Sequence, residues 1–113
     1  MKPINVVGSR VDIVIADDEE EPDLEGRDGC YSHDEGRILI DEDLAPALRW
    51  PILGHEIGHA VCKAISIEHQ LIDQFHLSDN DAEKLEELIC RLFVPVFLDT
   101  LERNKWLRPP VVR

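Results

Sequence analysis

Hydrophobic and polar residues alternate near the start of the chain in the pattern of β-strands. In the stretch INVVGSRVDIVIADD, apolar Val11, Ile13 and Ile15 occupy every second position, and Gly8-Ser9 separates them from a shorter apolar run. A period of two indicates a strand with one buried face. We therefore predict two short strands joined by a turn at Gly8-Ser9.

A second hairpin is predicted after an acidic interruption. The stretch ADDEEEPDLEGRD, residues 16–28, contains proline and glycine and is expected to form a loop. The stretch GCYSHDEGRILID then offers a turn at Asp34-Glu35-Gly36 and a return strand over residues 37–40.

The spacing of apolar residues changes to a helical one after this hairpin. Asp41 or Asp43 can cap a helix, and Pro46 suits its first turn. Because Pro51 lacks a backbone donor, we expect a short helix to end near Trp50 and a second helix to span residues 51–66.

The last third of the chain predicts one long helix. Residues 68–81 are less periodic and are expected to loop back, with at most a helical turn. Ser78 and Asp81 resemble a capping box, and the helix should continue to about Asn104 with a bend at Pro95. Its apolar stripe repeats at spacings of three and four: Leu85, Leu88, Ile89, Leu92, Phe93, Val96 and Phe97.

These elements predict an α+β fold in a single domain over residues 1–113. A small antiparallel N-terminal sheet would pack on the helix of residues 51–66 and on a second long C-terminal helix. Hydrophobic residues make up 43% of the chain and aromatic residues 5%, so an aliphatic core is expected.

Charge and cysteine usage limit the partners and the compartment. With 24 acidic and 12 basic residues, the formal charge is −12, so we expect no binding to nucleic acid or to anionic membranes. We also expect neither a signal peptide nor a transmembrane helix. Cys30, Cys62 and Cys90 form no CxxC pair, which favours a reducing, cytoplasmic location. The oligomeric state is left open.

The stretch LGHEIGHAV, residues 53–61, carries the chemistry. Residues four apart lie on one helix face, so His55 and His59 can reach one metal ion, while Glu56 beside them can act on a water molecule. The neighbouring residues carry no charge. Gly58 costs a helix about 1 kcal/mol relative to alanine, which indicates close packing at that point. We predict one zinc ion per chain, with Glu56 as the catalytic base.

A catalytic zinc ion takes three protein ligands and keeps one position open. The last helix offers Glu83, Glu86 and Glu87 for the third position. On a helical wheel Glu86 lies at the edge of the apolar stripe, whereas Glu83 and Glu87 lie near the opposite face. Glu86 is therefore the first choice and Glu87 the second.

Supporting residues are less sharply defined. Tyr31, His33, His69 and His76 are the possible donors to a developing oxyanion, and the sequence does not rank them. Asp73 or Asp99 could orient a ligand histidine.

The stretch RWPILGHEIGHAV, preceded by the strand RILID, resembles the ImmA/IrrE-type metallopeptidases and the small phage and bacterial proteins related to them. In that family a strand precedes the HExxH helix, and a later helix bears a glutamate ligand. Here EKLEELICRLFVPVF, residues 83–97, occupies that place. The resemblance covers residues 29–100, and only the HExxH block is specific. It implies a minimal zincin-like domain with His55, His59 and Glu86 as zinc ligands and Glu56 as general base.

The resemblance implies a gluzincin-like zinc peptidase that cleaves a specific protein target, such as a transcriptional regulator. An extended substrate would add to the sheet edge at the strand Arg37, Ile38, Leu39 and Ile40. Two alternatives stay open. One is a zinc-containing acidic protein that binds a partner and cuts nothing, and the other is an acidic interaction protein in which HExxH occurs by chance.

Overall fold

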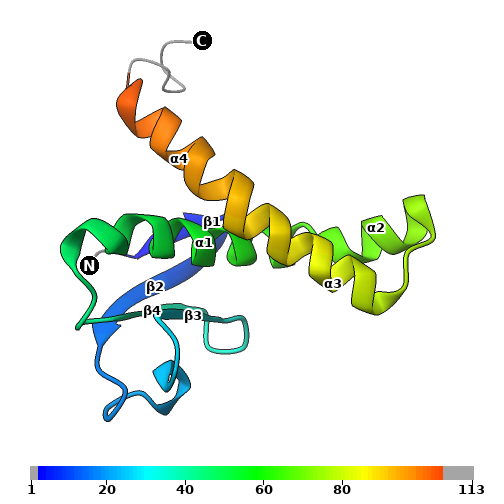
Figure 1. The fold of residues 1–113 in the computed structure, drawn as a ribbon. Helices are drawn as coiled ribbons and strands as arrows, with labels where there is room; N and C mark the ends of the chain where they lie inside the picture. The colour runs from blue at the N-terminus through cyan, green and yellow to red at the C-terminus, as the bar shows by residue number, and fades with distance from the viewer. Residues whose placement is uncertain (1–2, 106–113) are drawn as a thin grey trace.

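The computed structural model describes residues 3–105, which form a four-stranded sheet and a series of helices (Figure 1). This confirms the predicted α+β class. The sheet contains β1 (Ile4–Val6), β2 (Ser9–Ala16), β3 (Gly29–Ser32) and β4 (Arg37–Asp41), and a short 3-10 helix, η1 (Pro22–Leu24), lies in the acidic stretch.

Both predicted hairpins are present, but the sheet that they build is mixed. The strand order is β1-β2-β4-β3. The pairs β1–β2 and β3–β4 are antiparallel, while β2 and β4 are parallel, with Ile13 opposite Ile38. The expectation of a wholly antiparallel sheet is therefore wrong. The acidic stretch and β3 carry the chain back far enough for β4 to enter the sheet in the same direction as β2.

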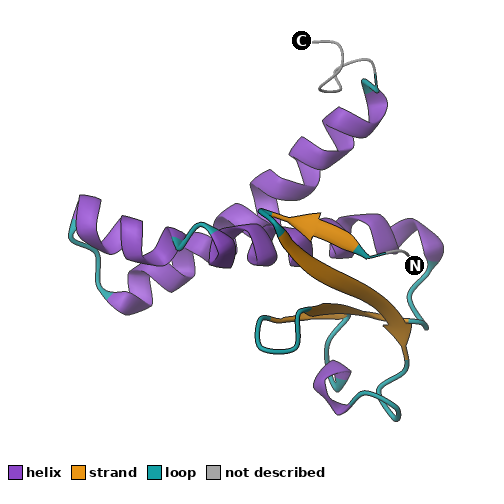
Figure 2. Cartoon of the chain, turned by 180° about the vertical axis from the view of Figure 1, so that it is seen from behind, coloured by secondary structure: helices purple, strands orange, loops and turns teal. Residues whose placement is uncertain are grey.

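The main core lies between one face of the sheet and a long helix, α1 (Pro46–Ala64) (Figure 2). Its buried members are aliphatic, as expected: Val6, Val11, Ile13, Ile38, Ile40, Leu53 and Ala60. A second, smaller cluster joins Ala16, Leu24 and Leu39, so η1 covers another part of the sheet.

Helix α1 is continuous through Pro51, so the prediction that a new helix starts there is wrong. Pro51 removes one backbone hydrogen bond, and its side chain is exposed. Packing of the residues after it against the sheet and the C-terminal helices stabilises the helix across this point. Tertiary contacts of this kind contribute more to a helix than local propensity does.

The rest of the described chain is mostly helical, with a turn at residues 65–66, a loop at residues 76–78 and a turn at residues 104–105. It comprises α2 (Ile67–Phe75), α3 (Asp79–Leu88), the π-helical turn η2 (Ile89–Phe93) and α4 (Val94–Arg103). The prediction of a loop over residues 68–81 is thus wrong for its first part. The predicted cap is confirmed, because Ser78 Oγ accepts a hydrogen bond from the backbone N–H of Asp81 at 3.1 Å.

The predicted long C-terminal helix spans α3, η2 and α4 and widens just before Pro95. The backbone N–H of Val94 bonds to the carbonyl of Ile89, five residues earlier, as a π-helical turn requires. Pro95 has no N–H of its own, so the helix is interrupted where one of its bonds is already missing.

The C-terminal helices cross α1 at two glycines. A Cβ atom at Gly54 would lie 3.2 Å from Cα of Pro95, and one at Gly58 would lie 3.1 Å from a methyl of Val94 and 3.2 Å from Cys90 Sγ. The prediction of close packing at Gly58 is therefore confirmed. Within residues 3–105, no helix has the length and apolarity needed to cross a membrane.

Candidate metal centre

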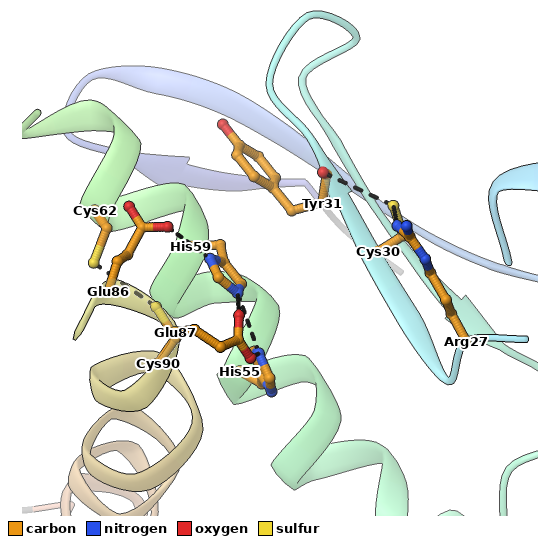
Figure 3. Close-up of polar contacts among 9 residues, drawn as sticks. All are labelled: Arg27, Cys30, Tyr31, His55, His59, Cys62, Glu86, Glu87 and Cys90. Atoms are coloured by element: carbon orange, nitrogen blue, oxygen red, sulfur yellow. Dashed lines mark hydrogen bonds and ion pairs between the residues drawn. The ribbon is translucent and has the colours of Figure 1, made fainter. Parts of the chain in front are cut away.

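The two histidines of the HExxH stretch lie one turn apart on α1 and converge, as the sequence predicts. The Nε2 atoms of His55 and His59 are 3.1 Å apart, and both side chains are partly buried. Figure 3 shows both rings beside Glu87, near the end of α3.

Glu87 on α3 completes a group of three donors. Its Oε1 atom lies 2.9 Å from His55 Nε2, and its Oε2 atom lies 2.9 Å from His59 Nε2. One donor atom from each of the three residues lies within 4.8 Å of the others. The group therefore joins α1 to α3 and can hold a metal ion.

The spacing of these donors fits a small ion. Two nitrogen ligands at about 2.05 Å from a tetrahedral zinc ion are separated by about 3.3 Å. The observed separations of 3.1 Å and 2.9 Å are close to that value. Two imidazoles and one carboxylate are also the donor set of one known class of catalytic zinc site.

Glu86, the first choice for the third ligand, lies outside this group. It is buried, and its Oε2 atom accepts a hydrogen bond from Nδ1 of His59 at 3.1 Å. This bond leaves the Nε2 atom of His59 free of a proton and directed at the other donors. The geometry thus favours Glu87, the second choice, as the ligand, with Glu86 as the residue that positions His59.

The helical wheel favoured Glu86 over Glu87, whereas the donor group contains Glu87. The wheel was centred on an apolar stripe that includes Leu92 and Val96, and both of these side chains are exposed. The side that contacts α1 instead carries Cys90 and Val94.

Glu56 is buried beside the histidines and has an unused acceptor. Its Oε2 atom is shielded from solvent and has no hydrogen-bond partner among the described residues. Burial raises the pKa of this carboxyl above its usual value, and His55 and His59 partly oppose the rise. A buried carboxylate with a free oxygen beside three metal donors is suited to accept a proton.

The group opens onto a cleft of about 600 Å³. Besides the residues of the metal group and Glu56, the cleft is lined by Arg27, Asp28, Gly29, Cys30, Tyr31, Ile52, Lys63 and Glu83. Glu83, the remaining candidate ligand, therefore reaches the cleft but not the donor group.

The predicted oxyanion donors are dispersed. Tyr31 lines the cleft, and its hydroxyl is 2.8 Å from Nδ1 of His33, which is itself exposed and outside the lining. Burial raises the pKa of the Tyr31 phenol, which keeps it protonated. His76 ends α2 in an exposed left-handed conformation, away from the cleft. Of the three, Tyr31 has the position of a donor.

The other supporting residues are also separate from the centre. His69 on α2 is absent from the cleft lining. Asp73 is exposed, and Asp99 pairs with Arg103 at 2.7 Å. It is therefore Glu86, and not an aspartate, that contacts a histidine of the donor group and can orient it.

The predicted substrate strand has no free edge. β4 is paired with β2 on one side and with β3 on the other, so residues Arg37–Ile40 cannot accept a further strand. Ile38, Leu39 and Ile40 are buried, and Arg37 binds Glu21 through two hydrogen bonds of 3.0 and 2.8 Å. The edge strand beside the cleft is β3.

The sequence analysis did not single out several residues of the cleft, among them Lys63, Gly29 and Arg27. Lys63 follows His55 and His59 at the same four-residue spacing, so the helical period was a usable signal for it. Gly29 lies against α1, where a Cβ would be 2.7 Å from Ile52 Cγ2 and 3.3 Å from Glu56 Cγ. Nothing local in the sequence marks Gly29 or Arg27.

Comparison with protein-family models, curated proteins and solved structures finds no match.

Proposed function

We propose that the protein is a zinc-dependent peptidase in which His55, His59 and Glu87 hold the metal and Glu56 is the general base. The observation that carries this proposal is the free, buried Oε2 atom of Glu56 beside a three-donor group at the wall of an open cleft. A purely structural site has no need of such a carboxylate.

A bound zinc ion would supply Lewis acidity, polarising a carbonyl and lowering the pKa of water towards ~7. The protein supplies the proton transfers. Glu56 accepts a proton from the attacking water and delivers it to the departing amine. Its raised pKa favours the first of these transfers, because the protonated carboxyl is then easier to form. Tyr31 donates a hydrogen bond towards the oxygen on which charge develops.

The cleft suits an extended peptide along β3. Gly29, Cys30 and Tyr31 line the cleft and lie on an edge strand, whose outer backbone groups can pair with a substrate. The order of sheet, HExxH helix and later glutamate-bearing helix is the one expected of a minimal zincin-like domain. It supports the resemblance to ImmA/IrrE-type enzymes, and hence a protein substrate such as a transcriptional regulator.

The test separates metal binding from turnover at one residue. Glu56→Gln should keep about one zinc per chain, as measured by elemental analysis. It should lower hydrolysis of a peptide library by roughly 10²–10⁴-fold, the usual contribution of a general base. Glu83→Gln, which changes another carboxylate of the cleft, is the matched control and should keep most of the activity. Equal activity in Glu56→Gln and the parent would show that Glu56 is not the general base.

A non-catalytic metal protein is the second candidate. Glu87 contacts the Nε2 atoms of both His55 and His59, so the three side chains also bind one another directly. In that case Glu56→Gln would leave metal content and partner affinity unchanged, and the parent protein would hydrolyse no member of the library.

A further inference from the structure

The C-terminal helices present an apolar face that no other part of residues 3–105 covers. Six large apolar side chains are between 38% and 66% exposed along α3, η2 and α4: Leu88, Leu92, Phe93, Val96, Phe97 and Leu101. No residue of α4 is buried, and the rings of Phe93 and Phe97 stack with centroids 5.7 Å apart. We call these six residues the C-terminal apolar face.

Leu88, Leu92 and Val96, which form the centre of this face, lie on the opposite side of the helix from the contact with α1. Cys90 and Val94 pack against Gly58, so they define the inner side. Leu88, Leu92 and Val96 follow one another at a spacing of four residues, so they form a line along one side of the helix.

Beyond its crossing with α1 at Gly54, helix α4 extends away from the sheet and from α1, and its apolar side chains are exposed. Figures 1 and 2 show this extension from opposite directions. The amount of apolar surface is large for a free helix. At roughly 200 Å² per large side chain and about half exposure, the face presents about 600 Å². A standard interface buries about 800 Å² on each partner, of which the apolar centre is a part.

We infer that the C-terminal apolar face is the contact surface of a homodimer, in which the same face of a second copy packs antiparallel against it. An isologous pair needs one self-matching patch, and a straight apolar helix face meets that need. This inference is independent of the proposed catalytic activity.

The distribution of charge favours a second copy over other occupants. Residues 88–105 carry Arg91, Arg103 and Lys105 against Asp99 and Glu102, a net charge of +1. The whole chain carries −12, so the remainder carries −13. Two copies that meet through residues 88–105 keep their acidic regions apart, whereas approach through most other surfaces brings like charges together. An anionic membrane or nucleic acid would be repelled by the remainder of the chain.

The experiment measures the mass of the full chain in solution. Sedimentation equilibrium over a wide concentration range should show a reversible dimer of the 12.9 kDa chain. Added salt should leave the dimer unchanged or strengthen it, because apolar contact provides the affinity and screening weakens the remaining repulsion. A mass of one chain at every concentration would overturn the inference.

Matched variants test which surface is used. Val96→Glu places a charge in the centre of the face and should weaken the dimer by roughly 30-fold or more, as at an interface hot spot. Phe93→Glu provides an independent second test. Phe75→Glu adds the same charge at an equally exposed apolar residue on α2 and should not change the dimer constant. Circular dichroism checks that each variant is folded. An unchanged dimer in both face variants, or dissociation in Phe75→Glu, would place the interface elsewhere.

Discussion

Two adjacent carboxylates in the metal centre have different tasks. Glu87 contacts Nε2 of both histidines, whereas Glu86 contacts only Nδ1 of His59. We predict that Glu87→Ala removes a ligand and abolishes stoichiometric zinc binding. Glu86→Ala keeps all three donors and should weaken zinc affinity by about 10–100-fold, as loss of a supporting hydrogen bond does. Competition with a chromophoric chelator measures both. The reverse order would return Glu86 to the ligand position.

At the residue scale, prediction from sequence worked where the information is local. The pairing of His55 with His59 follows from a four-residue spacing on one helix. The choice between Glu86 and Glu87 depends on how a distant helix is rotated about its axis. That rotation is set by glycine contacts on α1 and by the π-helical turn, and the pattern of apolar residues alone does not reveal either.

At the scale of elements, the close contact of Gly58 with Cys90 and Val94 sets how near α3, which carries Glu87, lies to α1. We predict that Gly58→Val lowers the free energy of unfolding by about 1–3 kcal/mol, because the new side chain must displace Cys90 and Val94. Urea denaturation measures the change. Ala64→Val, at an exposed position of the same helix, introduces the same side chain without the contact and should cost less than about 1 kcal/mol. Equal losses in the two variants would show that the crossing is loose.

The elements themselves were predictable to different degrees. Each hairpin is specified by a turn and two adjacent strands, so the sequence predicts both. The parallel pairing of β2 with β4, which joins the two hairpins into one sheet, depends on residues far apart in the chain. The continuity of α1 through Pro51 likewise depends on packing along the helix. This packing outweighs the loss of one backbone hydrogen bond at Pro51, on which the sequence-based prediction of a helix end relied.

At the scale of the whole molecule, a metal ion would fasten α1 to α3. We predict that the zinc-loaded protein unfolds at a higher temperature than the protein treated with a chelator, by several degrees. An ion at one hundred times its Kd stabilises the folded state by about 2.7 kcal/mol. Differential scanning calorimetry measures the shift. Glu56→Gln should retain it and His59→Ala should lose it, whereas a shift that survives in His59→Ala would locate the metal elsewhere.

The central position of β4 has a consequence for synthesis of the chain. β2 leaves the ribosome with β1 as its only available partner, and its other edge stays unpaired until residue 41 has been made. Val11 and Ile13, which face the core, also wait for α1 to cover them. An uncovered apolar strand edge readily pairs with other chains. Products of early termination should therefore tend to aggregate. The acidic stretch that follows β2 opposes this association, because it gives the fragments that contain it a negative charge.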